Sequence, residues 1–116
     1  MKSGIRFLFV LVLLVISQNV YSQTFGEGYY RLTTQWQGDG KSLDVVNDGE
    51  NNKLQLAKTA KVSGQYWEIT PIGDTGYFRL TTQWQGAGKS LDVINDGKKN
   101  NQLWLADTED VTGQYW

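Results

Sequence analysis

Hydrophobic and polar residues alternate along much of this chain with the two-residue period of β-strands. In "KSLDVVN" (41–47) a leucine and a valine share one face, while a serine and an aspartate share the other. The segment "KLQLAK" (53–58) alternates in the same way, and strands are also predicted for 29–35 and 65–72 from their aromatic and β-branched residues. No window after residue 23 keeps a helical period for three turns. The pattern therefore predicts an all-β protein with short strands.

The pattern of strands and turns occurs twice in the sequence. "YYRLTTQW" from Tyr29 returns as "YFRLTTQW" from Tyr77, 48 residues later. "VSGQYW" from Val62 returns as "VTGQYW" from Val111, 49 residues later, and the extra residue lies in the turn where "NDGENN" becomes "NDGKKNN". A repeat of this length predicts an array, a propeller or a symmetric closed fold. We expect four short strands in each copy.

The first 22 residues have the features of a secretory signal peptide. Lys2 and Arg6 precede the apolar run "FLFVLVLLVI", and small residues before Gln23 suit cleavage after Ser22. The alternative is a membrane anchor, but this run is well short of the roughly 20 apolar residues that span a bilayer. We therefore predict a signal peptide over residues 1–22 and a secreted, extracellular or periplasmic protein.

The composition of residues 23–116 excludes several classes of partner. Without Lys2 and Arg6, nine basic residues face twelve acidic ones. This balance argues against nucleic acid and, once the signal peptide is cleaved, against a membrane, because both require a basic patch. The chain has no cysteine, so the core or a partner must hold the fold together without disulfides.

The chemistry of the chain gives no support for an enzyme, a cofactor or a metal. Histidine and cysteine are both absent, which removes the usual base, thiol nucleophile and zinc ligands. "GDGKS" and "GAGKS" lack the first glycine of a phosphate-binding loop, and a strand follows where that loop needs a helix. The spacing in "LDVVNDG" does not match a calcium loop, although its carboxylates could meet a cation at a surface turn.

The order of motifs within each copy resembles that of the ricin-type β-trefoil lectins. Each copy has a Leu-Asp-Val strand, a polar turn, a strand with alternating leucines and then Gln-x-Trp, at 65–67 and 114–116. The resemblance implies a β-trefoil, which is built from three such repeats. We assign repeat one to 29–76 and repeat two to 77–116, with the third repeat missing. The chain is then either a fragment of a longer protein or one that completes its barrel by self-association.

The resemblance also implies a glycan or oligosaccharide as the partner. In this family an aspartate on the second strand accepts hydrogen bonds from sugar hydroxyls, an aromatic residue on the third strand stacks on the ring, and Asn and Gln near the last motif complete the site. The residues carried over by position are Asp44, Asp92, Gln55, Gln65 and Gln114.

Two elements of the family's site are replaced in both copies. Alanine stands at the aromatic position, and glycine stands where the family has the asparagine before Gln-x-Trp. In repeat two, Trp104 offers a ring displaced by two residues, and Asn100 and Asn101 are predicted as further sugar contacts. Because repeat two alone has a ring on its third strand, we expect repeat two to bind better.

Alternatives to this interpretation remain open from the sequence. Asp44 and Asp92 could instead accept amide hydrogen bonds across the "NDG" turns. The module could bind proteins or act as a scaffold, with decayed sugar sites, since a fold does not dictate a function. The tryptophans give a test of the strand register: Trp67 and Trp116 are expected in the core, and Trp36 more exposed than Trp67.

Overall fold

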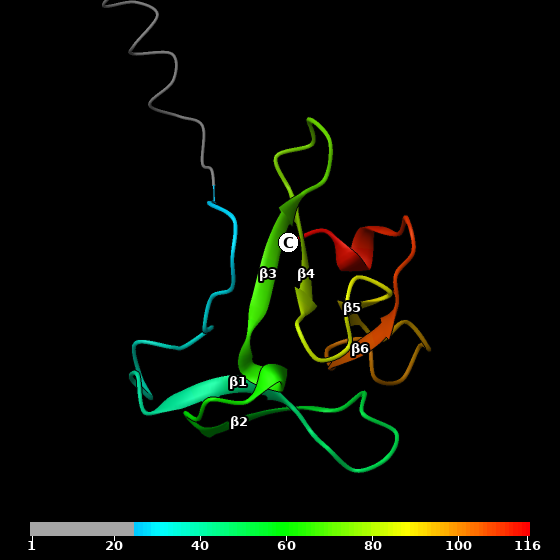
Figure 1. Cartoon of the computed structure of the whole chain (residues 1–116). Coiled ribbons are helices and arrows are strands. Elements are labelled where there is room, and N and C mark those ends of the chain that lie inside the picture. The colour runs from blue at the N-terminus through cyan, green and yellow to red at the C-terminus, as the bar shows by residue number, and fades with distance from the viewer. Residues whose placement is uncertain (1–24) are drawn as a thin grey trace, which may run out of the picture.

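The computed structural model describes residues 25–116, so the predicted signal peptide (1–22) lies outside the described part. The described chain is all-β, as predicted, apart from two short 3₁₀ turns (Figure 1). None of its helices is long and apolar enough to cross a membrane. In chain order the elements are β1 (Lys41–Val45), β2 (Leu54–Lys58), η1 (Ser63–Gln65), β3 (Trp67–Pro71), β4 (Phe78–Thr82), β5 (Lys89–Val93), β6 (Leu103–Asp107) and η2 (Thr112–Gln114).

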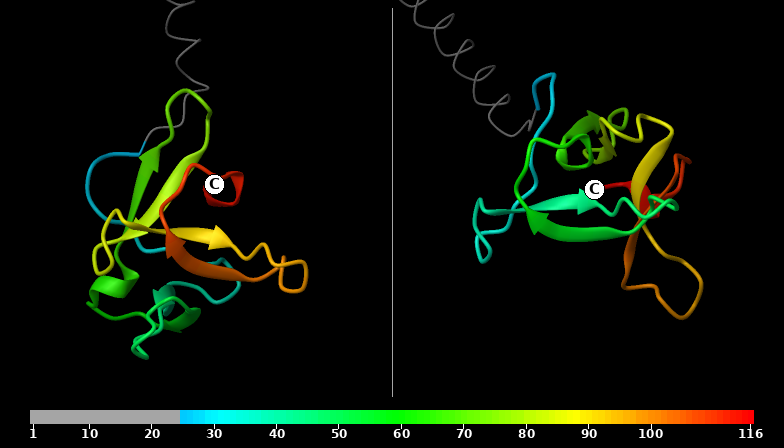
Figure 2. Two further views of the ribbon diagram at one scale, coloured as in Figure 1. Left: turned by 90° about the vertical axis from the view of Figure 1, so that its right-hand side faces the viewer. Right: turned by 60° about the horizontal axis from the view of Figure 1, so that its bottom comes forward.

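The strands form three antiparallel hairpins, β1–β2, β3–β4 and β5–β6. The first and third hairpins are equivalent parts of the two repeats, and β3–β4 joins one repeat to the next (Figure 2). The repeats also touch directly, because the amide of Leu105 on β6 donates to Asn52 O at 2.8 Å. The two copies therefore pack as one body around shared contacts.

The strand predicted at 29–35 is absent as a continuous element. Tyr30 forms an isolated bridge with Trp67, and Thr34 forms another with Gly38. The equivalent segment of repeat two, β4, pairs with β3 and also bonds Trp116 through Phe78, with N–O distances of 2.7 and 2.9 Å. A ladder needs partners along its length, and within 25–116 the first segment bonds strands only at separate points, Tyr30 with Trp67 and Leu32 O with Leu43 N at 2.8 Å. The prediction of a strand there was wrong for this reason.

The strand predicted at 65–72 begins later than expected. Residues 63–65 form η1, and the ladder starts at Trp67. The turn places Gln65 in the interior, where it is 1% exposed. Gln-x-Trp thus spans a tight turn and a strand start, and the same geometry recurs at η2.

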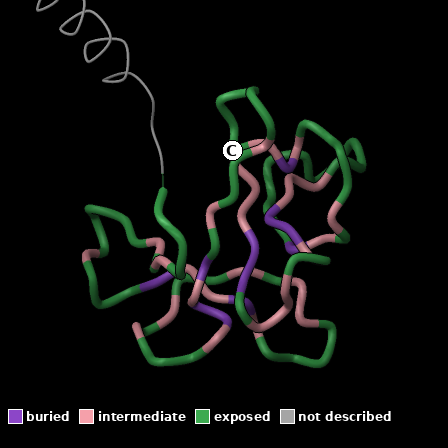
Figure 3. The backbone as a smooth tube through the Cα atoms, turned by 45° about the horizontal axis from the view of Figure 1, so that its top comes forward, coloured by how far each residue is buried: buried purple, intermediate pink, exposed green. Residues whose placement is uncertain are grey.

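A small core lies where the hairpins meet. Its buried apolar members are Val45, Trp67, Leu91 and Leu105, and the buried segments converge there in Figure 3. Trp67 is 0% exposed and its Nε1 donates to Leu43 O at 3.0 Å. The core therefore draws on both repeats.

The remaining tryptophans test the predicted register further. Trp36 is 90% exposed, so the prediction that it is more exposed than Trp67 is confirmed. Trp116 keeps the equivalent hydrogen bond, from Nε1 to Leu91 O at 2.9 Å, but is 37% exposed. Its predicted burial was wrong, because the described chain does not cover its outer side.

Candidate functional site

The hairpin of repeat one places Asp44 beside the other predicted residues of its site. Asp44 on β1 pairs directly with Gln55 on β2, and Gln65 Nε2 donates to Asp44 Oδ2 at 3.4 Å. Gln65 is otherwise bonded to the backbone, with Nε2 donating to Lys58 O at 3.0 Å and Oε1 accepting from Ala60 N at 2.9 Å. Gln65 therefore orients the aspartate and is not itself free to hold a ligand.

Repeat two builds the same arrangement around Gln114. Its Nε2 donates to Asp92 Oδ2 at 3.2 Å and to Asp107 O at 2.8 Å. Its Oε1 accepts from Glu109 N at 3.0 Å and from Arg79 Nη1 at 2.7 Å. Gln114 is 1% exposed, so it too acts through the aspartate that it positions.

The glycine before each Gln-x-Trp motif is required by the position of the carboxylate. A Cβ added to Gly64 would lie 2.8 Å from Asp44 Oδ1, and one added to Gly113 would lie 2.7 Å from Asp92 Oδ1. Such separations are shorter than van der Waals contact allows, so any side chain there would displace the aspartate. The departure from the family pattern is thus linked to the way these aspartates lie.

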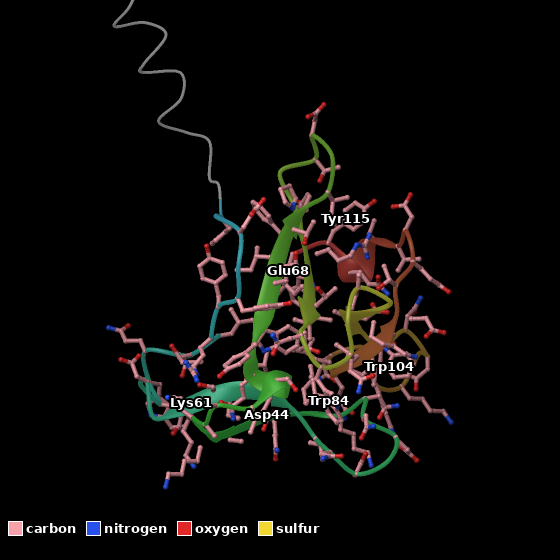
Figure 4. The ribbon with its side chains drawn as sticks, viewed as in Figure 1. Asp44, Lys61, Glu68, Trp84, Trp104 and Tyr115 are labelled. Atoms are coloured by element: carbon pink, nitrogen blue, oxygen red, sulfur yellow. The ribbon has the colours of Figure 1, made fainter. Side chains whose placement is uncertain are left out.

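A cavity of about 460 Å³ opens beside Asp44. Its polar lining includes the carboxylate of Asp44 and the amides of Asn47 and Gln55, and Trp84 forms one wall. Asp44 is half-buried and Gln55 is exposed. In Figure 4 the labelled Asp44 and Trp84 lie close together below β3–β4. The cavity therefore combines hydrogen-bonding groups with an aromatic surface.

Trp84 comes from repeat two, and sequence reasoning missed its role in the pocket of repeat one. Two backbone bonds fix it there: Trp84 N donates to Ser63 O at 3.3 Å, and Gln83 N donates to Tyr66 O at 2.9 Å. The third strand of repeat one carries no ring, but its cavity takes one from Trp84. The "TTQWQG" repeat was visible in the sequence, but its position across the junction depends on the packing of the two copies.

The equivalent cavity of repeat two has a volume of about 470 Å³ and is lined by Asp92, Asn95 and Trp104 among others. Trp104 pairs directly with Asp92 across β5–β6 and is 36% exposed, so its predicted outward position is confirmed (Figure 4). Within residues 25–116 this cavity has no tryptophan at the place that Trp84 takes in repeat one.

Asn100 and Asn101 do not line the cavity that contains Asp92. Asn100 Oδ1 accepts from Asp96 N at 3.1 Å and from Gly97 N at 2.9 Å, so it closes the turn. Asn101 is exposed. The structure brings Asn95 to the cavity instead, and Asn47 to the one in repeat one. Their signal in the sequence is their equal spacing, three residues after each aspartate.

The amides of the "NDG" turns bond other aspartates than Asp44 and Asp92. Asp48 Oδ1 accepts from Glu50 N at 3.1 Å and from Asn51 N at 3.0 Å. The Asn51 amide, followed by the Lys53 side chain, lowers the pKa of Asp48. A structural role for Asp44 in this turn is therefore wrong.

Asp96 takes the same role in repeat two. Its Oδ1 accepts from Lys99 N at 2.7 Å and from Lys98 N at 2.9 Å, and these amides, in that order, lower its pKa. Among the described residues, no group of three potential metal-ligating side chains gathers at either turn or elsewhere. The carboxylates of Asp44 and Asp92 thus take no part in the turns and line their cavities.

No protein-family model matches the sequence, and a search of curated proteins found no match. A search of solved structures found the crystal structure of a designed 3-fold symmetric protein, ThreeFoil. The similarity has a TM-score of 0.63 and 30% sequence identity, and it covers 80% of this chain and 65% of that chain. The chain has a β-trefoil-type fold. The chain spans about 65% of the length of ThreeFoil.

Proposed function

We propose that this protein is a secreted, non-catalytic carbohydrate-binding module that binds a glycan in the cavity beside Asp44. The observation that carries the proposal is the placement of a half-buried carboxylate and the ring of Trp84 around one open cavity of about 460 Å³. A cavity of this size suits a small ligand. The predicted signal peptide at 1–22 supports export.

The chemistry of the cavity fits a sugar better than an apolar ligand. Gln65 holds Asp44 through Oδ2, which leaves lone pairs of the carboxylate to accept from neighbouring hydroxyls. The amides of Asn47 and Gln55 can both donate and accept. A flat ring such as that of Trp84 covers the C–H face of a pyranose. A single site of this kind binds with a Kd on the order of millimolar, or about −4 kcal/mol.

We propose the reverse of the ranking that the sequence predicted for the two sites. Repeat two was favoured because of Trp104, but repeat one has the ring of Trp84. Within the described chain, the Asp44 cavity is bounded by both repeats, whereas the Asp92 cavity is bounded by repeat two. We therefore propose the Asp44 cavity as the primary site and the Asp92 cavity as a secondary one.

A glycan array on the purified chain would identify the sugar class, and ¹H–¹⁵N NMR titration with the best hit would locate it. We expect shifts at Asn47, Gln55 and the Trp84 indole, and loss of binding in Asp44→Asn and Trp84→Ala. Asp74→Asn, in the exposed turn of the β3–β4 hairpin, is the matched carboxylate control and should bind normally. Sugar binding that survives both pocket variants, or an array without hits, would contradict the proposal.

A protein-interaction function is the second candidate, and one observation favours it. Trp36 is 90% exposed, which is unusual for the largest apolar side chain. An exposed tryptophan is a typical anchor of protein interfaces. A negative glycan array together with a Trp36-dependent protein contact would favour this function over sugar binding.

A further inference from the structure

The loop that carries Trp36 and the loop that carries Trp84 have one sequence and one conformation. Both read "TTQWQG", at 33–38 and 81–86. Gly38 N donates to Thr34 O at 2.8 Å, and Gly86 N donates to Thr82 O at 2.8 Å. The two glycines have φ values of 70° and 72°, in the left-handed region that glycine adopts at little cost. The loops therefore present their tryptophans in the same way.

The surroundings of the two tryptophans differ. Trp84 is half-buried against η1 of the other repeat, where its Cε3 lies 3.5 Å from the position of a Cβ on Gly64. Trp36 is 90% exposed. One loop has a docking surface within the described chain, and the other has none there.

The surface that would fit Trp36 is present in repeat two. The groove beside Asp92, which we call the η2 groove, is formed by Asp92, Val93, Asn95, Val111, Thr112 and Gly113. Each of these six residues is the counterpart of one that lines the cavity containing Trp84, with Thr112 in place of Ser63. The groove is also lined by Glu109 and by Trp104, which stands where the other cavity has Gln55. The two surfaces thus share the strand and η-turn positions that face the tryptophan loop, and they differ on the side formed by Trp104 and Glu109.

Backbone donors and acceptors also match. At the existing junction Trp84 N donates to Ser63 O and Gln83 N donates to Tyr66 O. The counterparts of these two acceptors are Thr112 O and Tyr115 O, and neither receives a bond from such a loop within residues 25–116. The corresponding donors are Gln35 N and Trp36 N, for which the described chain offers no acceptor.

We propose that the Trp36 loop docks in the η2 groove of a second copy of this chain. The contact reproduces, between two chains, the junction that Trp84 makes within one. It is heterologous, because the loop of one chain meets the groove of another. A second copy is the favoured occupant because the chain itself carries an exposed loop with the sequence and conformation that this type of groove already binds.

The three-fold arrangement limits how the copies can assemble. Suppose that repeat one of a rigid second copy follows repeat two of the first copy, in the same way that repeat two follows repeat one within a chain. Repeat two of the second copy would then overlap repeat one of the first. Docking therefore requires the second copy to separate its repeats at the connection between Ile72 and Tyr77. In the described chain this connection is closed by a hydrogen bond that Ile72 N donates to Tyr77 O at 2.9 Å. Exchange of equivalent elements in this way is domain swapping. Three copies of residues 25–116 supply repeats for two complete sets of three, so the closed assembly of this segment is a trimer.

The test is light scattering on the purified chain over a dilution series. We expect association that ends in a trimer, and Trp36→Ala should weaken it by on the order of tenfold or more. Val111→Arg blocks the η2 groove and should weaken association to a similar extent. Both side chains are exposed, Trp36 at 90% and Val111 at 39%, so circular dichroism should show unchanged folds. Tyr29→Ala, which alters an aromatic residue that is 48% exposed outside the loop, is the matched control.

Mixing the two variants separates this contact from any other. Trp36→Ala keeps an intact groove and Val111→Arg keeps an intact loop, so the mixture should recover a two-chain complex that neither variant forms alone. A monomer at every concentration would overturn the proposal. Association that is insensitive to Trp36→Ala, or a mixture without recovery, would overturn it as well and indicate a different interface.

Discussion

At the scale of single residues, two glycines determine where the aspartates can lie. Gly64 and Gly113 leave room for a carboxylate oxygen at the place where a Cβ would stand 2.8 and 2.7 Å away. The sequence showed only that the family's asparagine was replaced. The reason was hidden, because it depends on contacts between residues 20 and 21 positions apart that no local pattern records. By contrast, the burial of Trp67 followed directly from the Gln-x-Trp motif and the apolar strand after it.

Gly64→Ala should therefore displace Asp44 and weaken sugar binding. Crowding of this kind typically costs about 1–3 kcal/mol of stability. Gly40→Ala is the control, because nothing lies within 4 Å of a Cβ at that position. Urea denaturation measures the stability and NMR titration the binding. Equal behaviour of the two variants would show that the glycine is not needed at position 64.

Gln65→Ala should destabilise the fold more than the loss of an exposed side chain would. It removes a buried amide that bonds Lys58 O and Ala60 N in part-buried positions, and each such hydrogen bond contributes about 0.5–1.5 kcal/mol. Chemical denaturation should show the loss. Gln55→Ala removes a glutamine that is exposed on β2, and the stability should then change little.

At the scale of elements, hairpins were predictable and edges were not. The alternation in 41–47 and 53–58 gave β1 and β2 within two residues of their observed ends. The segment 29–35 has the composition of a strand and nearly the sequence of β4, yet it forms isolated bridges. Composition sets the preference for extended backbone, but a ladder forms only where a partner is present.

The two "NDG" turns should loosen in acid. Amide hydrogen bonds hold the pKa of Asp48 and Asp96 below the ordinary value of 3.8. A group whose pKa is lowered by folding stabilises the fold above its unfolded pKa, and this contribution is lost as pH falls through the folded value. The amide resonances of Asn51 and Lys99 should therefore shift below about pH 3.8. Asp39, which is exposed and outside these turns, is the reference residue. Amides that stay constant down to acid unfolding would contradict the expectation.

At the scale of the whole molecule, the fold depends on a small core that both repeats share. Among residues 25–116, four apolar side chains are buried: Val45, Trp67, Leu91 and Leu105. The sequence predicted the all-β class and the repeated unit, because both follow from local patterns. It did not predict which ring would line which cavity, since Trp84 reaches Asp44 only after the repeats have packed.

Trp67→Ala and Trp116→Ala form a matched pair that tests this core. Both tryptophans donate from Nε1 to a strand carbonyl, but Trp67 is 0% exposed and Trp116 is 37% exposed. Truncating a fully buried tryptophan costs about 3–5 kcal/mol, so Trp67→Ala should unfold the chain at much lower temperature. Trp116→Ala should lower the melting temperature less. Calorimetry measures both, and the reverse order would show that the core lies elsewhere.

The origin of the ring in each cavity has a consequence for how binding sites are counted. Because Trp84, which completes the cavity of Asp44, comes from the following repeat, a site of this kind belongs to a junction and not to a repeat. Two repeats in a row share one junction, three in a row share two, and three in a closed ring share three. Closing the ring adds a site without adding a residue. Valence, and with it the avidity for a multivalent glycan, therefore depends on closure and not on chain length alone.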